Sequence, residues 1–450
     1  MFLGSKRKSY FMIQRCYFIT FLLLFFLNSC SSSSVNDVND HIDDTDINNS
    51  VTPKQPNILL LIADDVSKDP IPNYTEGVTK ANMPNLQSLM NSGITFDNTW
   101  AYAVCSPTRA SIITGKYGIK NGVIEVGDQI STSETSLQKY ISDNTNDAYA
   151  TAIFGKWHIS NDTNDAAIMG VDHFAGIRSG GVQDYYSWPL IENGVSTTNT
   201  TYMTTKLTDL AIDWKAVQTK PWFLWMAYTA PHTPFHLAPT NLHSQGNLPT
   251  DETSIDTNPL SYYLSALEAL DSEIGRLISS MSDEEKANTI IIFIGDNGTP
   301  GQVAQSPYRR RTVKGSLYQG GINVPMVVSG NGVNRMGERE NALINSTDLY
   351  ATIGNIVGIS ATEMYNSQSF YGLLTDENGA KRDYVYSEKE DAYTIRNVNY
   401  KYIKYDTGAE EFYNLTNDAY ENSNLIGTNL TTTATAAKSA LIAEANRIRN

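Results

Sequence analysis

Cysteine is scarce in this chain of 450 residues, which contains three. Cys16 and Cys30 lie in an N-terminal segment that we expect to be an export signal, so the body of the protein would hold only Cys105. A single thiol excludes an internal disulfide framework. In an exported protein such a thiol is a candidate reactive group, and the alternative is an inert, buried cysteine.

Positive charge is also in short supply. The chain has 33 lysine and arginine residues against 48 aspartate and glutamate residues, for a formal net charge of −15. A nucleic-acid-binding protein would show a basic footprint, so we expect no nucleic-acid partner. An anionic substrate would have to be attracted by a local cationic pocket, against the overall negative field.

The N-terminal segment lacks an apolar run long enough to span a bilayer. Residues 17–27 are apolar and follow a basic stretch, which is the pattern of an export signal over residues 1–30. The run ends in Leu-Asn-Ser-Cys, which resembles a bacterial lipobox with Cys30 as the lipidated residue; plain cleavage is the alternative. We therefore expect an outer-membrane lipoprotein facing the periplasm or the surface, or else a periplasmic or secreted protein. The polar, acidic residues 31–55 are expected to form a disordered tether.

Buried strands are indicated by apolar runs that end abruptly in polar residues. Residues 56–65 and 289–298 are the clearest, because a continuous apolar run is typical of a strand buried on both faces. Residues 148–154 and 221–229 follow the same pattern more loosely. A fifth run, residues 324–330, carries no evident chemistry.

Helical periodicity between these runs completes an α/β pattern. Apolar residues recur at helical spacing over residues 83–90, 207–214 and 264–278. Alternating strands and helices predict a large, mostly parallel sheet sandwiched by helices over residues 56–368. In such sheets ligands bind beyond the carboxyl ends of the strands, so the polar residues that follow the strands should meet at one rim.

The pattern changes at about residue 369. Short, tyrosine-rich, alternating runs separated by turns predict antiparallel strands, and a helix is expected near residues 432–448. We therefore predict a smaller C-terminal subdomain with an antiparallel sheet and a helix over residues 369–450.

Asp64, Asp65, Asp296 and Asn297 follow the two clearest strands and offer only hard oxygen ligands. Three converging carboxylates without a cation would raise one another's pKa. A divalent cation resolves that repulsion, and an all-oxygen set suits calcium or magnesium better than zinc. The alternative is a helix cap and a turn.

The stretch CSPTRASIITG at residues 105–115 predicts a loop that turns into a short helix, with Pro107 in the first turn. Cys105 would then lie at a helix N-terminus, where free N–H groups and the helix dipole favour an anion. Arg109, one turn further on, can direct its guanidinium group to the same place.

Cys-x-Pro-x-Arg, followed by a small-residue helix and Thr-Gly, resembles the signature of the type I sulfatases. The resemblance implies that Cys105 is oxidised to formylglycine (3-oxoalanine), by a formylglycine-generating or an anaerobic sulfatase-maturing enzyme. The hydrate of that aldehyde would be the nucleophile. It also implies one Ca²⁺ ion, held by Asp64, Asp65, Asp296 and Asn297 together with the modified residue 105.

The same resemblance assigns roles to the remaining rim residues. Lys156 and Lys314 would neutralise the sulfate oxygens, and His232 would protonate the leaving alcohol. His158 would take the proton whose removal releases sulfate, and Arg109 would orient the hydrate. Lys314 lies in KGSLYQGG, where the family normally has glutamate in place of Gln319; this departure puts a supporting contact in doubt, not Lys314 itself.

The substrate is less clearly indicated. Candidate substrate-binding residues are His236 and the run Arg309, Arg310 and Arg311, which could hold a further sulfate or uronate or could be a solvated basic loop. The aromatic residues in DYYSW at 184–188 could stack on a sugar or belong to the core. The resemblance favours sulfated polysaccharide fragments, with marine algal polymers such as ulvan, carrageenan or fucoidan as the leading class. The alternatives are a phosphonate monoester or phosphodiester hydrolase of the same superfamily, and a non-catalytic lipoprotein that binds sulfated glycans.

Overall fold

The computed structural model describes residues 55–450. The predicted export signal, the lipidation at Cys30 and the tether fall in or adjoin residues 1–54, outside the described residues. In the part that the structure describes, no helix is both long enough and apolar enough to cross a membrane. The boundary between residues 368 and 369 remains a prediction.

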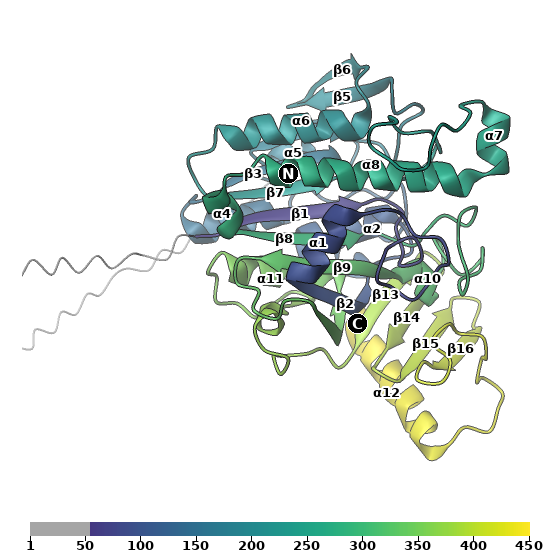
Figure 1. Ribbon diagram of the computed structural model, residues 1–450. Helices are drawn as coiled ribbons and strands as arrows, with labels where there is room; N and C mark the ends of the chain where they lie inside the picture. Colours follow the sequence, from purple (N-terminus) through teal and green to yellow (C-terminus); the bar gives the residue numbers. More distant parts are fainter. Residues whose placement is uncertain (1–54) are drawn as a thin grey trace, which may run out of the picture. The chain divides into compact units, whose positions relative to one another are not determined.

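A ten-stranded sheet forms the centre of the fold (Figure 1), in the order β10-β2-β9-β8-β1-β7-β3-β4-β5-β6. Its strands are β1 (Asn57–Ala63), β2 (Gly93–Trp100), β3 (Ala150–Lys156), β4 (His173–Ile177), β5 (Trp188–Glu192), β6 (Val195–Asn199), β7 (Trp222–Ala227), β8 (Thr289–Gly295), β9 (Asn323–Gly330) and β10 (Glu338–Asn345).

The prediction of a mostly parallel sheet is confirmed, although the sheet is mixed. The central strands β8, β1, β7, β3 and β4 are parallel, whereas β9 runs antiparallel to both of its neighbours and β5 and β6 extend the edge as antiparallel strands. The connection from β8 to β9 begins and ends at the same rim. Both ends of that connection, residues 296–322, can therefore contribute to one site.

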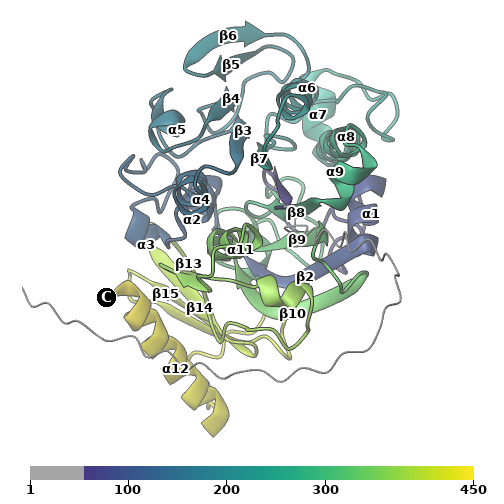
Figure 2. The ribbon, with the colours of Figure 1, turned by 90° about the vertical axis from the view of Figure 1, so that its left-hand side faces the viewer.

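Helices cover both faces of the sheet, as Figure 2 shows. One face carries α1 (Pro84–Ser92), α6 (Met203–Ala216) and α8 (Pro259–Ser279), and the other carries α2 (Cys105–Thr114), α4 (Leu137–Thr145) and α11 (Leu349–Ile356). Alternate residues of β1 enter the two cores: Ile58, Leu60 and Ile62 pack on the α2 side, and Leu59 and Leu61 on the α8 side. A strand buried on both faces reads as the continuous apolar run seen in the sequence.

Several short elements connect these layers. They are α3 (Gly118–Asn121), α5 (Asp165–Ile168), α7 (Glu252–Thr257), α9 (Asp283–Ala287) and α10 (Gln319–Ile322), the two-residue strands β11 (Glu363–Met364) and β12 (Ser367–Gln368), and the 3₁₀ turns at Ser346–Asp348 and Tyr371–Leu374.

The C-terminal part contains the predicted antiparallel sheet and helix. The strands β13 (Val385–Lys389), β14 (Ala392–Arg396), β15 (Tyr400–Tyr405) and β16 (Glu410–Asn414) pair in sequence order, and α12 (Thr432–Arg449) packs on β14 and β15. Tyr386, Ile395, Tyr402 and Phe412 form a buried cluster with Leu441 of the helix. The other face of this small sheet is also buried, because Val385, Ile403 and Tyr413 form a cluster with Trp100 and Leu343 of the large sheet.

Candidate active site

Four oxygen-bearing side chains meet where β1 and β8 end. The two strands are adjacent and parallel, with Ala63 opposite Gly295, so Asp64 and Asp65 come level with Asp296 and Asn297. The backbone N–H of Asp65 donates to Asp296 Oδ1 at 3.0 Å, and the amide of Asn297 donates to Asp65 Oδ1 at 2.8 Å. All four side chains are buried.

Asp65 is held in a left-handed backbone conformation, with φ +65°. A non-glycine residue adopts this conformation only when its surroundings enforce it. The hydroxyl of Tyr263, on α8, donates to the carbonyl of Asp65 at 2.9 Å and fixes the turn. The strain therefore serves to direct the Asp65 carboxylate into the site.

Each carboxylate of the cluster has a cationic partner. Lys156 Nζ, at the end of β3, lies 2.6 Å from Asp64 Oδ2, and Lys314 Nζ lies 2.6 Å from the Asp65 carboxylate. Arg109 donates from Nη2 and Nε to Asp296 Oδ2, at 2.7 and 3.1 Å. Three cations that are far apart in the sequence thus neutralise three buried carboxylates.

The pKa shifts follow from these pairs. Burial raises the pKa of Asp65, but Lys314 and the other cations outweigh it and hold the pKa below its usual value. For Asp296, burial and the neighbouring Asp64 raise the pKa despite Arg109. The two carboxylates therefore differ in how strongly the surrounding protein stabilises their charge.

Cys105 is the first residue of α2, as the sequence predicted, and its side chain points into the cluster. Its Sγ lies 3.2 Å from His158 Nδ1, and burial raises the pKa of the thiol. In this form the cysteine is a neutral thiol at pH 7.

Two histidines border the cluster. Burial, reinforced by Lys156 and Arg109, lowers the pKa of His158 to about 2, so its imidazole is neutral. His158 also has a left-handed backbone, with φ +54°, and its carbonyl accepts from the Ser106 hydroxyl at 2.8 Å. His232 Nε2 lies 3.8 Å from Asp65 Oδ2, while its Nδ1–H donates to the Thr233 carbonyl at 2.8 Å.

A pair of glycines that the sequence pattern did not single out packs against both histidines. A Cβ on Gly180 would lie 2.7 Å from the His158 ring, and one on Gly181 would lie 3.1 Å from His232 Nδ1. The nearby Tyr185 hydroxyl donates to the His232 carbonyl at 2.7 Å. The sequence signal that was available is the Ser-Gly-Gly turn at residues 179–181, shortly after a buried strand.

The candidate substrate-binding residues lie outside the cluster. Arg309, Arg310 and Arg311 are exposed; Arg309 donates to Asn422, and the side chains of the other two have no hydrogen bond or ion pair with any described residue. They lie on the loop that leads to Lys314. This leaves two guanidinium groups available at the surface near that lysine in sequence.

His236 is held by protein partners at both ring nitrogens. Its Nδ1–H donates to the Pro234 carbonyl at 2.9 Å, and its Nε2 accepts from the Tyr202 hydroxyl at 3.1 Å. The ring stacks on Tyr185 with centroids 4.0 Å apart. Tyr185 and Trp188 are each 1% exposed, which favours the core alternative, whereas Tyr186 is 40% exposed.

Gln319 stands where the resemblance to the sulfatases leads us to expect glutamate. Its side-chain oxygen accepts from Trp100 Nε1 at 3.1 Å, and its backbone N–H donates to Glu421 at 2.7 Å. Glu421 also pairs with Lys401 at 2.5 Å, with both side chains buried. A carboxylate is thus present beside residue 319, but it comes from the C-terminal part of the chain.

The residues of the cluster fit a hard divalent cation. Asp64 Oδ1 and Asn297 Oδ1 are buried and have no hydrogen-bond partner among the described residues. One ligand atom from each of Asp64, Cys105 and Asp296 can lie within 4.8 Å of the other two. Buried oxygens without donors are rare in folded proteins, and a bound cation would satisfy both.

Two family models match the chain over most of its length. Residues 56–359 match the sulfatase model, and residues 312–447 match the model described as N-sulphoglucosamine sulphohydrolase, C-terminal. The chain belongs to the sulfatase family. The family that the Cys-x-Pro-x-Arg pattern indicated is thereby confirmed, and the members of this family hydrolyse sulfate esters.

Similar proteins are spread over bacteria and animals. The sulfatase is 28% identical over 372 residues to an uncharacterized sulfatase, YdeN, of Escherichia coli, an alignment that spans 69% of this chain and 64% of that protein. It is 25% identical to an ulvan-active sulfatase of Formosa agariphila, over 84% of this chain and 71% of that one.

Solved structures show the same fold. The crystal structure of Ps i-CgsB in complex with k-i-k-neocarrahexaose superposes with a TM-score of 0.74 at 23% identity, covering 88% of this chain and 92% of that chain. This agreement confirms the architecture of a large mixed sheet with a small antiparallel sheet at the C-terminus.

Proposed function

We propose that this chain is a calcium-dependent sulfatase that hydrolyses sulfate esters on polysaccharide fragments after oxidation of Cys105 to formylglycine. The observation that carries the proposal is the cluster at the β1 and β8 ends. It combines three buried carboxylates, two buried oxygens without a donor and a cysteine at a helix N-terminus.

Asp64, Asp65, Asp296 and Asn297 would hold the calcium ion, beside residue 105. When present, the ion supplies Lewis acidity and the formylglycine supplies an oxygen nucleophile. The fit rests on the donor set, because carboxylate and amide oxygens are the ligands that calcium takes.

The cationic side chains provide electrostatic stabilisation of a sulfate group. Lys156 and Lys314 are each held beside a carboxylate. Lys156 is also buried, so its ammonium group is fixed in place and shielded from water. Fixed charges in a water-poor site stabilise developing negative charge more strongly than mobile ones. Arg109, bound to Asp296 by two hydrogen bonds, holds the cluster in register and adds a third positive charge.

The two histidines divide the proton transfers. His232 has its Nδ1–H fixed on a backbone carbonyl, so its Nε2 is the atom that can deliver a proton to the leaving alcohol. The Nδ1 of His158 faces residue 105, at 3.2 Å from Cys105 Sγ. This position makes His158 the group that would accept a proton from the side chain at 105.

Sulfated algal polysaccharide fragments are the proposed substrate class. One relative is an ulvan-active sulfatase, and a structural neighbour was crystallised with a carrageenan-type hexaose. The exposed Arg310 and Arg311 on the loop before Lys314 would meet an additional sulfate or uronate group. Export, a lipid anchor on Cys30 and a formylglycine-forming partner enzyme complete the proposal.

The test is a desulfation screen over defined ulvan, carrageenan and fucoidan oligosaccharides, each with and without a calcium chelator. We expect release of sulfate that falls with chelation and returns when calcium is restored. Aryl phosphodiester and phosphonate substrates are run beside them. Faster turnover of the phosphorus substrates would show that the chain is a phosphonate monoester or phosphodiester hydrolase instead. Saturable binding of glycan without turnover, with an unmodified thiol at 105, would indicate the non-catalytic lipoprotein.

A further inference from the structure

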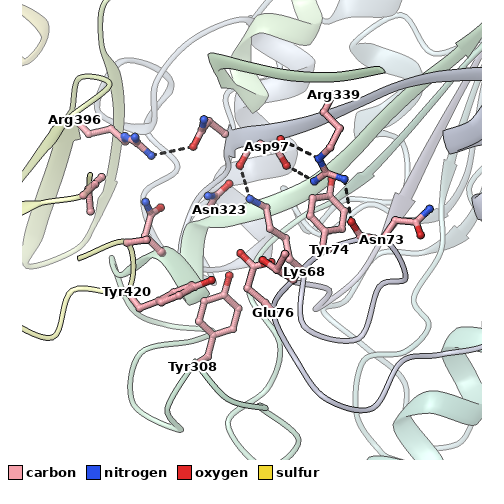
Figure 3. Close-up of a pocket in the computed structure, with 15 residues that line it drawn as sticks. Lys68, Asn73, Tyr74, Glu76, Asp97, Tyr308, Asn323, Arg339, Arg396 and Tyr420 are labelled. Carbon is pink, nitrogen blue, oxygen red and sulfur yellow. Dashed lines mark hydrogen bonds and ion pairs between the residues drawn. The ribbon is translucent and has the colours of Figure 1, made fainter. Parts of the chain in front are cut away.

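A second polar cavity, of about 480 Å³, lies apart from the carboxylate cluster. Its wall is formed by the loop after β1, by β2, β9 and β10, and by residues of the C-terminal part (Figure 3). None of the predicted catalytic or metal-binding residues lines it. We call it the cation pocket, after its charged lining residues Lys68, Arg339 and Arg396.

Two of these three cations have no carboxylate partner. Arg339 forms an ion pair with Asp97. Lys68 instead donates to the backbone carbonyl of Asp97, and no ion pair connects Lys68 to any described residue. Arg396 likewise donates only to neutral groups: the carbonyls of Asn397 and Val398 and the side-chain oxygen of Asn98, at 2.7 to 3.1 Å.

Both unpaired cations are buried, with Lys68 3% and Arg396 5% exposed. Burial lowers the pKa of Lys68 to about 8 and that of Arg396 to about 10. The three cations also repel one another, since Arg396 and Arg339 both act to lower the pKa of Lys68. Buried charges are normally paired, so this pocket carries positive charge that the protein itself leaves uncompensated.

The acidic groups that face the pocket do not remove this excess. Glu76 and Asp97 act on Lys68, but the Asp97 carboxylate is already bound by Arg339. Glu421 acts on Arg396, but it forms its own buried ion pair with Lys401. Among the described residues, Glu76 is thus the one carboxylate lining the pocket that has no cation within ion-pair distance. The pocket therefore has one unpaired carboxylate and two unpaired cations.

The pocket is larger than an inorganic anion requires. Its volume falls in the range of about 300–1,000 Å³ that is usual for small-molecule sites. The rings of Tyr308 and Tyr420 meet edge to face on one wall, with centroids 6.0 Å apart. Figure 3 shows these two tyrosines beside Glu76 and below Lys68. Aromatic rings beside polar groups suit a sugar ring, which has an apolar face and hydroxyl edges.

We propose that the cation pocket is a second binding site of this protein, which takes an acidic saccharide through a carboxylate or sulfate group held by Lys68 and Arg396. The inference goes beyond the proposed function, because it assigns a ligand to residues that take no part in hydrolysis. Tyr308 and Gln319 line the pocket, and Lys314 lies between them in sequence without lining it.

The experiment is isothermal titration calorimetry with glucuronate, which carries no sulfate ester, and with glucose as the neutral control. We expect glucuronate to bind one site and glucose to show no binding. Arg396→Gln should weaken glucuronate binding at least tenfold, whereas Lys139→Gln, which removes the same charge from an exposed position on α4, should leave it unchanged. Inorganic sulfate, measured as a competitor so that only the glucuronate site is read, should bind the pocket more weakly than glucuronate, because the sugar ring contributes.

A variant of opposite sign protects the test against misfolding. Glu76→Gln removes the pocket's unpaired carboxylate and should tighten glucuronate binding severalfold. Both variants should keep kcat/KM for a small aryl sulfate within twofold of the parent. Equal binding of glucose and glucuronate, unchanged affinity in both variants, or inorganic sulfate binding as tightly as glucuronate would overturn the proposal. Because binding is read without turnover, its failure is distinct from failure of the proposed function.

Discussion

The carboxylate cluster and the cation pocket treat buried positive charge in opposite ways. At the cluster, Lys156, Lys314 and Arg109 each lie against a carboxylate. In the cation pocket, Lys68 and Arg396 are buried but donate only to neutral oxygens. The cations of the cluster are all paired within the chain, whereas among the described residues the pocket has two unpaired cations and one unpaired carboxylate, Glu76.

This difference separates two kinds of site. Paired cations position and neutralise groups that belong to the protein, so the cluster can be assembled before any substrate arrives. Unpaired buried cations destabilise the folded protein until a ligand supplies the counter-charge. We therefore expect that removal of a positive charge destabilises the protein at the carboxylate cluster and does not destabilise it at the cation pocket.

The largest expected effect is on turnover at the cluster. Cys105→Ala removes the side chain that we propose is oxidised to the nucleophile, and it should lower kcat by at least about a thousandfold. Ser111→Ala, at another buried position of the same helix α2, is the matched control, and its kcat should stay within twofold of the parent. Sulfate release from an aryl sulfate measures both. Substantial turnover by the alanine variant would remove residue 105 from the chemistry.

His232→Gln tests the assignment of the acid. Loss of a general acid should lower kcat by about a hundredfold or more on a sulfated sugar, whose alcohol is a poor leaving group. The loss should be much smaller on nitrophenyl sulfate, whose phenolate needs no proton. His173→Gln, at the first residue of β4 and so at the opposite end of that strand from the rim, should leave both rates unchanged. An equal loss on both substrates would indicate a role in binding instead.

A matched pair of lysine substitutions compares the two sites directly. Lys156→Met leaves the Asp64 carboxylate without its closest cation and should lower the free energy of unfolding by about 3 kcal/mol. Lys68→Met removes an uncompensated charge and should leave that free energy unchanged or raise it. Urea unfolding of calcium-free protein at pH 7 measures both. Destabilisation by Lys68→Met as large as that by Lys156→Met would contradict the contrast.

The pH dependence of the free energy of unfolding tests the burial of Lys68 more sharply. In the folded protein burial lowers the pKa of Lys68 to about 8, below its ordinary value of 10.5. Between these pH values the unfolded chain binds more protons, so the stability of the parent protein should rise with pH relative to Lys68→Met. The gain over this window should approach about 3 kcal/mol. A parallel pair of stability curves from pH 7 to 10.5 would show that Lys68 is not desolvated.

The smallest effect expected is at Gln319. Replacing it by glutamate restores the family's usual residue but brings a second carboxylate beside the buried Glu421, which already contacts the residue 319 backbone. Like charges in a buried environment repel, so the melting temperature should fall by a few degrees with turnover little changed. Differential scanning calorimetry measures this shift. A higher melting temperature would show that two carboxylates, one at residue 319 and one at Glu421, are tolerated side by side.

The sequence was sufficient for the fold class because its signals are local. Continuous apolar runs predicted buried strands, and the residues after β1 and β8 meet because adjacent parallel strands end at one rim. The direction of β9 could not be predicted, since a run buried on both faces reads the same in either orientation. The contact of Gly180 with His158 and the meeting of Lys68 with Arg396, 328 positions apart, depend on tertiary packing that no spacing records.

The most direct test of the central claim is the mass of the peptide that contains residue 105, from protein produced together with a maturation enzyme. The account predicts an aldehyde-bearing residue whose fraction rises in proportion to sulfatase turnover across preparations. Fully active protein in which residue 105 is an unmodified thiol would contradict it.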